Sequence, residues 1–319
     1  MTLQTAARTD QLVVVDRIQR STSVTEFVLE RADGRRLPDW APGAHIDVVL
    51  PSGKIRQYSL CGDRWAPNQY RIAVQRDDAG TGGSLEIHEE IHLGETVSFG
   101  GPRNNFRLAP AQNYRFIAGG IGITAVLPMI EQAEKLNLEW QLLYLGRTAE
   151  RMAYRNLADQ YPGRVAMHTS VDHGRASIRQ WLGELPADTM VYACGPEAML
   201  EALPEECPEL PEQFLRTERF TNTLAEATVS SEPYEIVLSR SGKVINAPGT
   251  APMTDVLARA GVDVITSCAK GVCGTCEVDV VEGEIDHRDA ILDDDERAAN
   301  TCMFPCVSRA LSKRLVLDL

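Results

Sequence analysis

The 319-residue sequence contains no run of about 18 apolar residues, the length that a membrane-spanning helix needs. Its first eight residues lack the apolar core of a secretion signal. Basic residues are in the minority, 32 Lys and Arg against 45 Asp and Glu, and the net charge of −13 disfavours nucleic acid and anionic membranes as partners. These features predict a cytoplasmic protein that binds neither of them.

Cysteine, in contrast, is present in a pattern. Eight cysteines without a secretion signal argue for reduced thiols and metal ligation rather than disulfides. Four near the C-terminus are spaced C-x4-C-x2-C, then twenty-nine residues, then C, which is the plant-type spacing for a [2Fe–2S] cluster. The predicted ligands are Cys268, Cys273, Cys276 and Cys306.

Two alternatives compete with this interpretation. A zinc knot usually offers two C-x2-C-like pairs, whereas here three cysteines share one loop and the fourth stands alone. Gly271 and Gly274 would also let backbone N–H groups approach cluster sulfurs. Cys302 is a rival fourth ligand, but the spacing to Cys306 fits better and Cys302 is interpreted as a bystander.

The chain divides into three expected domains. Residues 1–109 hold short β-branched segments separated by turn residues, which predicts an antiparallel β-barrel with strands at 11–15, 25–29, 46–50 and 70–74. Residues 110–222 alternate strands and helices, which predicts a parallel α/β sheet. A polar linker at 223–233 then leads to the cysteine-bearing domain at 234–319.

Two short motifs in the first domain contain groups that are suited to binding a phosphate or a flat ring, although each motif is a weak signal alone. Arg56-Gln57-Tyr58-Ser59 offers an arginine for a phosphate, a tyrosine for a flat ring and a hydroxyl for a ring nitrogen. Gly82-Gly83-Ser84 opens a predicted short helix, whose free N–H groups favour an anion. Either motif alone also fits an ordinary polar strand or turn.

Two glycine turns in the second domain each follow a predicted strand. Gly119-Gly120-Ile121-Gly122-Ile123-Thr124 enters a helix, where glycines would let a dinucleotide come close. It is not the G-x-G-x-x-G fingerprint, so a plain Rossmann dehydrogenase is not indicated. Cys194-Gly195-Pro196 forms a second turn at the same sheet edge, and the alternative there is a simple strand cap.

Taken in order with the C-terminal cysteines, these motifs resemble the phthalate dioxygenase reductase family, within the wider ferredoxin–NADP reductase superfamily. The resemblance covers nearly the whole chain. It implies FMN in the barrel, NADH on the α/β domain and a C-terminal plant-type ferredoxin domain of β-grasp fold. One departure is Ala125, where the family commonly carries proline.

The resemblance also implies roles for individual residues. FMN would be held by the R-x-Y-S strand and the G-G-S loop, with Val74 and Gln75 lining it through the backbone. Thr124 and Cys194 match residues near the nicotinamide, and Phe220 matches an aromatic residue that covers the flavin ring. Arg147, in Gly146-Arg147-Thr148, matches the adenosine-side loop. Ser59, Thr124, Cys194 and Phe220 are the candidate catalytic residues.

The nucleotide is expected to be NADH rather than NADPH. Asp172 falls where a carboxylate could accept a hydrogen bond from the ribose 2′-hydroxyl and would repel a 2′-phosphate. Arg175 lies close in sequence and weakens this inference.

Two further patterns are given structural interpretations. His88-Glu89-Glu90-Ile91-His92 matches the zinc-protease motif H-E-x-x-H, but Gly94 stops the helix two residues later. The acidic run Asp293–Glu296 is interpreted as a helix cap with acids in the first turn, with docking of a basic partner as the alternative.

The expected function is an NADH-dependent reductase component that works as a monomer. NADH would give a hydride to FMN, and the cluster would pass single electrons to a Rieske-type aromatic-ring oxygenase or O-demethylase. No C-x-H pair of a Rieske half-site occurs in the chain, so the terminal oxidation belongs on another protein. The alternatives are a reductase for a cytochrome P450 and a non-catalytic electron-transfer or sensor module.

Overall fold

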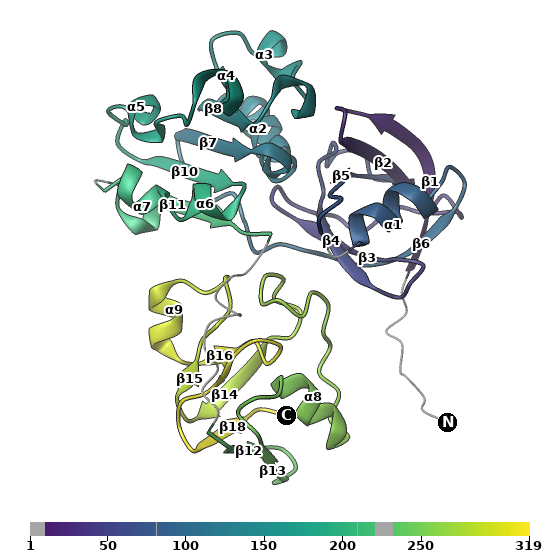
Figure 1. Ribbon diagram of the computed structural model, residues 1–319, viewed down its shortest axis with the longest axis vertical. Coiled ribbons are helices and arrows are strands. Elements are labelled where there is room, and N and C mark those ends of the chain that lie inside the picture. The colour runs from purple at the N-terminus through teal and green to yellow at the C-terminus, as the bar shows by residue number, and fades with distance from the viewer. Residues whose placement is uncertain (1–9, 81, 209, 221–231) are drawn as a thin grey trace. The chain divides into compact units, whose positions relative to one another are not determined.

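A computed structural model describes residues 10–80, 82–208, 210–220 and 232–319, and the chain divides into two compact units (Figure 1). The first unit is Met1–Glu218 and the second is Arg219–Leu319. None of the helices among the described residues has the length and apolar character that a membrane crossing requires.

The first unit begins with a six-stranded antiparallel sheet in the order β4-β3-β6-β1-β2-β5. An isolated bridge between Leu60, just after β4, and Ile72 of β5 links the two edge strands. The four predicted strands are confirmed as β1, β2, β3 and β5. Their alternate apolar residues fill one core inside the barrel, which is the pattern that predicted them. The elements are β1 (Asp10–Gln19), β2 (Val24–Glu30), β3 (His45–Val49), β4 (Ile55–Ser59), β5 (Gln69–Gln75), α1 (Gly83–Glu90) and β6 (Thr96–Arg103).

The unit continues with a five-stranded sheet in the order β11-β10-β7-β8-β9, in which all neighbours are parallel, as predicted. Its strands are β7 (Asn113–Gly119), β8 (Glu139–Gly146), β9 (Val165–Thr169), β10 (Thr189–Cys194) and β11 (Leu215–Glu218). The connections carry η1 (Gly120–Gly122), α2 (Ile123–Lys135), η2 (Ala149–Arg151), α3 (Leu157–Gln160), α4 (Ser170–His173), α5 (Ile178–Leu182), α6 (Glu197–Leu200), α7 (Leu203–Glu206) and η3 (Glu212–Phe214).

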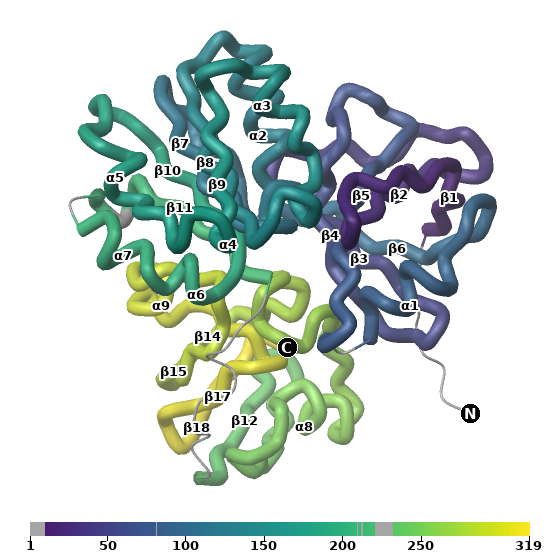
Figure 2. The backbone as a smooth tube through the Cα atoms, turned by 45° about the horizontal axis from the view of Figure 1, so that its top comes forward, coloured from purple at the N-terminus to yellow at the C-terminus, as the bar shows by residue number. Residues whose placement is uncertain are grey.

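Both faces of this sheet are covered, which explains why its strands are apolar throughout. Phe116 of β7 packs on the α2 side, whereas the next residue, Ile117, packs on the side of α5 and α7. Figure 2 shows α2 lying along β7 and β8. The carboxyl ends of β7 and β10 therefore meet at one edge, directly before the two glycine turns.

The second unit has a mixed sheet in the order β13-β12-β18-β14-β16, with β12 and β18 parallel, and a small β15-β17 pair. Met253 and Leu257 of α8 complete its core. Asp293 caps α9 in a reciprocal capping box with Glu296, which confirms the predicted cap. The elements are β12 (Tyr234–Leu238), β13 (Val244–Ala247), α8 (Met253–Arg259), β14 (Val278–Glu282), β15 (Ile285–Asp286), α9 (Asp294–Ala299), β16 (Cys302–Met303), β17 (Arg309–Ala310) and β18 (Arg314–Leu317).

The expected domain boundaries relate to these units as follows. The boundary at residues 109 and 110 lies between β6 and β7, inside the first unit. The division between the units follows Glu218, four residues before the expected end of the second domain at residue 222. Most of the expected linker, 223–233, lies outside the described residues.

Candidate cofactor sites

The motif Arg56-Gln57-Tyr58-Ser59 lies on β4, beside the start of α1. A Cβ added to Gly83 would lie 2.4 Å from Nε of Arg56, so the arginine packs directly on this glycine. Gly82 has a φ of +85°, and a Cβ there would be 3.9 Å from Nζ of Lys54. Two cations thus lie at the N-terminus of an eight-residue helix, which is an arrangement suited to a phosphate. Lys54 was not predicted from the sequence.

The other residues of this strand differ in their surroundings. Tyr58 packs against the barrel core, and burial raises the pKa of its hydroxyl. Ser59 is buried, and the Gln57 amide donates to the Asp47 carboxylate at 3.0 Å. Gln57 therefore has a partner within the protein. Ser84 is likewise engaged, since its Oγ accepts from the Asp77 backbone N–H at 3.1 Å.

The end of β5 connects the barrel to the first glycine turn. The Val74 side chain is buried in the barrel core, and its carbonyl lies 3.0 Å from Nε2 of His88. A Cβ added to Gly120, whose φ is +54°, would lie 3.9 Å from Oε1 of Gln75. Gln75, which is predicted to line the flavin, and the predicted nicotinamide turn are thus neighbours.

The two glycine turns pack tightly against each other. A Cβ on Gly122 would lie 2.1 Å from the carbonyl oxygen of Cys194, and one on Gly119 would lie 2.6 Å from Cδ of Pro196. A Cβ on Gly195 would be 2.9 Å from Cα of Gly119. The sequence suggested that these glycines make room for a dinucleotide. At Gly119, Gly122 and Gly195 the close neighbours are protein atoms, so packing of the two turns already requires glycine.

Thr124 and Cys194 are buried at this edge. The Thr124 hydroxyl donates to the Ile121 carbonyl at 2.9 Å, which links the start of α2 to η1. Sγ of Cys194 lies 3.9 Å from a carboxylate oxygen of Glu218, because β10 and β11 pair these two residues in register. Burial and the nearby Glu218 raise the pKa of the Cys194 thiol well above its usual value.

Glu218 is a residue that sequence reasoning missed as a candidate. Burial raises the pKa of its carboxyl to about 8, although the contact with Cys194 opposes this shift. The one sequence signal for Glu218 is that an acidic residue stands at the end of a short strand of the parallel sheet. A carboxyl that holds its proton near neutral pH, beside a buried thiol, marks this sheet edge as a candidate reaction site.

The adenosine-side candidates lie on neighbouring loops of the same sheet. The Val171 N–H donates to the carbonyl of Arg147 at 3.1 Å, which joins the loop after β8 to α4. Asp172 lies exposed in α4 and accepts from the Thr169 hydroxyl at 2.5 Å. Arg175 is exposed two residues after α4 ends. Phe220 belongs to the second unit, and 39% of its side chain is exposed.

The four predicted cluster ligands are free thiols arranged as two pairs. Cys268 donates to Cys273, and Cys306 donates to Cys276, so the pKa values of the two acceptors, Cys273 and Cys276, are lowered. Within the described part of the chain no three His, Cys, Asp or Glu side chains converge as ligands of one ion. Two pairs of thiols suit a cluster of two irons, each held by two thiolates.

The loop backbone supports the same fit. Sγ of Cys268 accepts from the Lys270 N–H at 3.3 Å, and Sγ of Cys273 accepts from the Thr275 N–H at 3.4 Å. Gly271 and Gly274 have φ values of +68° and +74°, which turns the backbone so that N–H groups face the sulfurs. Such bonds stabilise thiolates. Cys302 instead belongs to β16, in register with Asp279 of β14, and its interpretation as a bystander stays a prediction.

The H-E-x-x-H histidines contact different partners. His88 lies on α1 and bonds the Val74 carbonyl, whereas His92 lies beyond the end of α1, 3.0 Å from a guanidinium nitrogen of Arg17. The helix ends at Glu90, so the two histidines do not share a helical face.

The C-terminal region matches a known domain family. Residues 236–311, which include all four paired cysteines, match the family described as "2Fe-2S iron-sulfur cluster binding domain". An antiparallel barrel, a parallel sheet with glycine turns and this domain together define an electron-transferring reductase of modular build.

The whole chain also has close relatives. It is 36% identical to the phthalate dioxygenase reductase of Burkholderia cepacia, over 97% of both chains, and 36% identical to the carnitine monooxygenase reductase subunit of Escherichia coli (strain K12), over 93% of this chain and 94% of that one. The solved phthalate dioxygenase reductase structure superimposes with a TM-score of 0.70 at 35% identity, covering 97% of both chains. This chain belongs to the phthalate dioxygenase reductase family.

A third relative is part of a longer protein. An intact type IV self-sufficient cytochrome P450 monooxygenase matches 97% of this chain with a TM-score of 0.91 and 35% identity. This chain covers only 41% of that P450 chain. The same modular reductase is therefore similar both to separate reductase subunits and to a segment of a P450 protein.

Proposed function

We propose that this chain is the NADH-dependent reductase component of a two-component oxygenase system, with FMN in the barrel and a [2Fe–2S] cluster in the second unit. The contact between β5 and the first glycine turn, where Gln75 meets Gly120, carries this proposal. There a residue predicted to line the flavin borders the predicted nicotinamide turn, as direct transfer between two bound rings requires.

Arg56 and Lys54 at the start of α1 would hold the FMN phosphate. A single phosphate needs one compact anion site, and two cations with the free N–H groups of a helix start provide it. Tyr58 and Ser59 would contact the ring, since they follow Arg56 on the same strand. FMN supplies the ability to take a pair of electrons as hydride and to release them singly, which a [2Fe–2S] cluster requires.

The nucleotide would lie along the carboxyl edge of the parallel sheet. Thr124, Cys194 and Glu218 would surround the nicotinamide, while Arg147 and Asp172 would bind the adenosine end. Asp172 is exposed and would accept a hydrogen bond from the 2′-hydroxyl of NADH. The negative charge of its carboxylate would repel the 2′-phosphate of NADPH. Phe220 would cover the flavin ring, and Cys268, Cys273, Cys276 and Cys306 would hold the cluster.

We propose a Rieske-type oxygenase as the acceptor. The relatives named phthalate dioxygenase reductase and carnitine monooxygenase reductase subunit support a separate oxygenase component. A cytochrome P450 is the second candidate, favoured by the high TM-score to the self-sufficient P450. We also propose a monomer in a reducing, cytoplasmic environment, consistent with eight free thiols.

An anaerobic titration with NADH and then with NADPH, followed by visible absorbance, tests the proposal. NADH at low concentration should bleach both the flavin and the cluster bands, and NADPH should need a much higher concentration. Bleaching of the flavin alone would rule out the cluster as the outlet. No response in a protein that contains both cofactors would favour a non-catalytic electron-transfer role. Adding a purified Rieske oxygenase or P450 to the reduced protein then identifies the acceptor class.

A further inference from the structure

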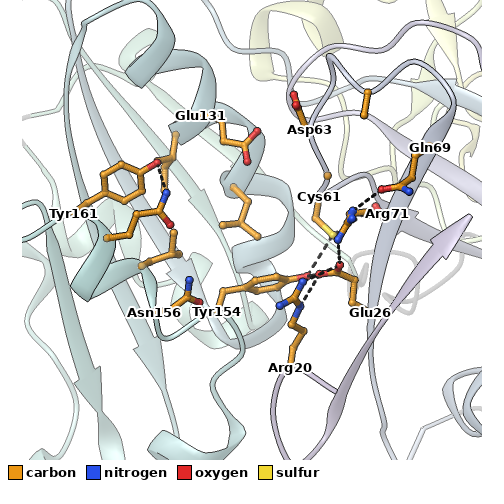
Figure 3. Close-up of a pocket in the computed structure, with 16 residues that line it drawn as sticks. Arg20, Glu26, Cys61, Asp63, Gln69, Arg71, Glu131, Tyr154, Asn156 and Tyr161 are labelled. Carbon is orange, nitrogen blue, oxygen red and sulfur yellow. Dashed lines mark hydrogen bonds and ion pairs between the residues drawn. The ribbon is translucent and has the colours of Figure 1, made fainter. Parts of the chain in front are cut away.

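A cavity of about 470 Å³ lies between the barrel and the α/β sheet, within the first unit (Figure 3). Glu26 of β2 reaches it from the barrel side, and Tyr154, which follows η2, reaches it from the sheet side. The Glu26 side chain is only 2% exposed. Its carboxylate is therefore buried where the two halves of the unit meet.

Every acceptor position of this carboxylate is used. One oxygen accepts from the Tyr154 hydroxyl at 2.7 Å and from Nε of Arg20 at 2.8 Å, and the other accepts from Arg20 at 3.0 Å and from Arg71 at 2.8 Å. Burial opposes ionisation of Glu26, but the bonds from Arg20 and Tyr154 outweigh it and lower its pKa. Burial raises the pKa of Tyr154. A neutral phenol therefore donates to a charged carboxylate throughout the neutral range.

A second contact joins the same two segments. The backbone N–H and the hydroxyl of Thr22, in the β1–β2 turn, both donate to the Glu150 carbonyl of η2, at 3.0 and 3.1 Å. Thr22 and Glu26 belong to one hairpin of the barrel, and Glu150 and Tyr154 belong to one segment of the α/β domain. Two anchors four residues apart thus fix this segment to that hairpin.

The anchored segment is continuous with the loop expected to bind adenosine. It begins at Gly146-Arg147-Thr148, and a Cβ on Gly146 would lie 2.3 Å from Cγ of Met152, so the two ends of the segment pack together. Tyr154 itself has a φ of +57°, a left-handed conformation that is costly for a tyrosine. Its hydrogen bond to Glu26 offsets that cost and keeps the segment in place.

We propose that Thr22, Glu26 and Tyr154 are positioning residues for the nucleotide: the flavin barrel holds the adenosine-side loop through them and thereby sets the affinity for the ADP-ribose half of NADH. This rests on the proposed function. None of the three need touch the nucleotide. The barrel thus contributes to nucleotide binding through residues that lie on no predicted binding motif.

Ordinary packing between domains is the competing explanation. The same junction contains such contacts, for example Lys135 with Asp63 at 3.5 Å, where both side chains are about half exposed. Exposed pairs of this kind contribute little. The Glu26–Tyr154 hydrogen bond differs because it is buried and charge-assisted, and because Tyr154 has a strained backbone. Loss of this bond should therefore shift the segment from Gly146 to Tyr154.

The test measures binding of ADP-ribose to the intact holoprotein by calorimetry. Tyr154→Phe removes only the hydroxyl, and we expect the ADP-ribose dissociation constant to rise about fivefold, because only part of the free energy of a charge-assisted hydrogen bond is transmitted along the segment to the nucleotide. KM for NADH should rise in parallel, while the rate of flavin reduction at saturating NADH changes less than twofold. Thr22→Val, which removes one of two donors to Glu150, should produce a smaller rise in the same constant.

Tyr161→Phe is the matched control. Tyr161 lines the same cavity, but its hydroxyl accepts from the neighbouring Gln160 and forms no hydrogen bond with the described residues of the barrel. Unchanged ADP-ribose binding in Tyr154→Phe, or an equal loss in Tyr161→Phe, overturns the inference. Failure of the unmodified protein to bind ADP-ribose overturns the proposed function, and the inference with it. Flavin absorbance and iron content report whether each variant is correctly folded.

Discussion

At the scale of single residues, the most informative side chain is Glu218. Its carboxyl keeps a proton to about pH 8 because burial disfavours the charged form. This half-buried residue contacts the fully buried Cys194 thiol beside the glycine turns.

This pKa shift predicts a dependence of stability on pH. The pKa of Glu218 is raised above the unfolded value of about 4.5, so the folded protein binds the extra proton between about pH 4.5 and 8. Its contribution to stability is therefore full below pH 4.5 and is lost as the pH rises through 8. Within this window the free energy of unfolding should fall by about 1.4 kcal/mol per pH unit from this one group.

Glu218→Gln is the variant that tests it. The glutamine keeps the shape but cannot titrate, so chemical denaturation at pH 5, 6, 7 and 8 should show a flatter profile than the unmodified protein. Equal slopes in the two proteins would mean that Glu218 ionises normally.

The cluster ligands give a second prediction at this scale. Cys306→Ser removes one member of a thiol pair, and we expect loss of most of the bound iron and of the cluster absorbance. Cys302→Ser is the matched control four residues away, and it should retain both. Iron analysis together with visible absorbance decides between them. The opposite pattern would make Cys302 the fourth ligand.

At the scale of elements, the two glycine turns are held by backbone packing. Gly122→Ala would place a Cβ 2.1 Å from the Cys194 carbonyl, and backbone atoms cannot move aside as a flexible side chain can. We expect a loss of about 1–3 kcal/mol in the free energy of unfolding, measured by denaturant titration. Gly100→Ala, where the nearest atom to the Cβ is 3.5 Å away, should change it by less than about 1 kcal/mol. Equal effects would contradict the packing argument.

The elements also show what the sequence could and could not predict. The strands and α2 followed from local patterns, because alternation and apolar runs report which side of each element is buried. The contact of Arg56 with Gly83 joins residues 27 apart, and that of Glu26 with Tyr154 joins residues 128 apart. Such pairs depend on which strands become neighbours. For the same reason Glu218 was missed, since its role requires the pairing of β11 with β10.

At the scale of the whole molecule, the order of the modules predicts an order of electron flow. The barrel and the parallel sheet share one unit, while all four cluster ligands belong to the other. If the cluster is the outlet, removing it should stop delivery to one-electron protein acceptors without stopping the reaction between NADH and the flavin. A single variant should therefore lose electron delivery to protein acceptors while it keeps the reduction of the flavin by NADH.

Cys306→Ser again provides the test, now through turnover. We expect NADH-dependent reduction of ferricyanide, a small acceptor that can react at the flavin, to stay within about twofold of the unmodified protein. Reduction of cytochrome c, a protein acceptor that we expect to take its electrons from the cluster, should fall by about tenfold or more, as loss of a relay implies. Cys302→Ser should keep both rates. If the cluster-free variant still reduced cytochrome c at full rate, electrons would leave from the flavin itself, and the second unit would need another role.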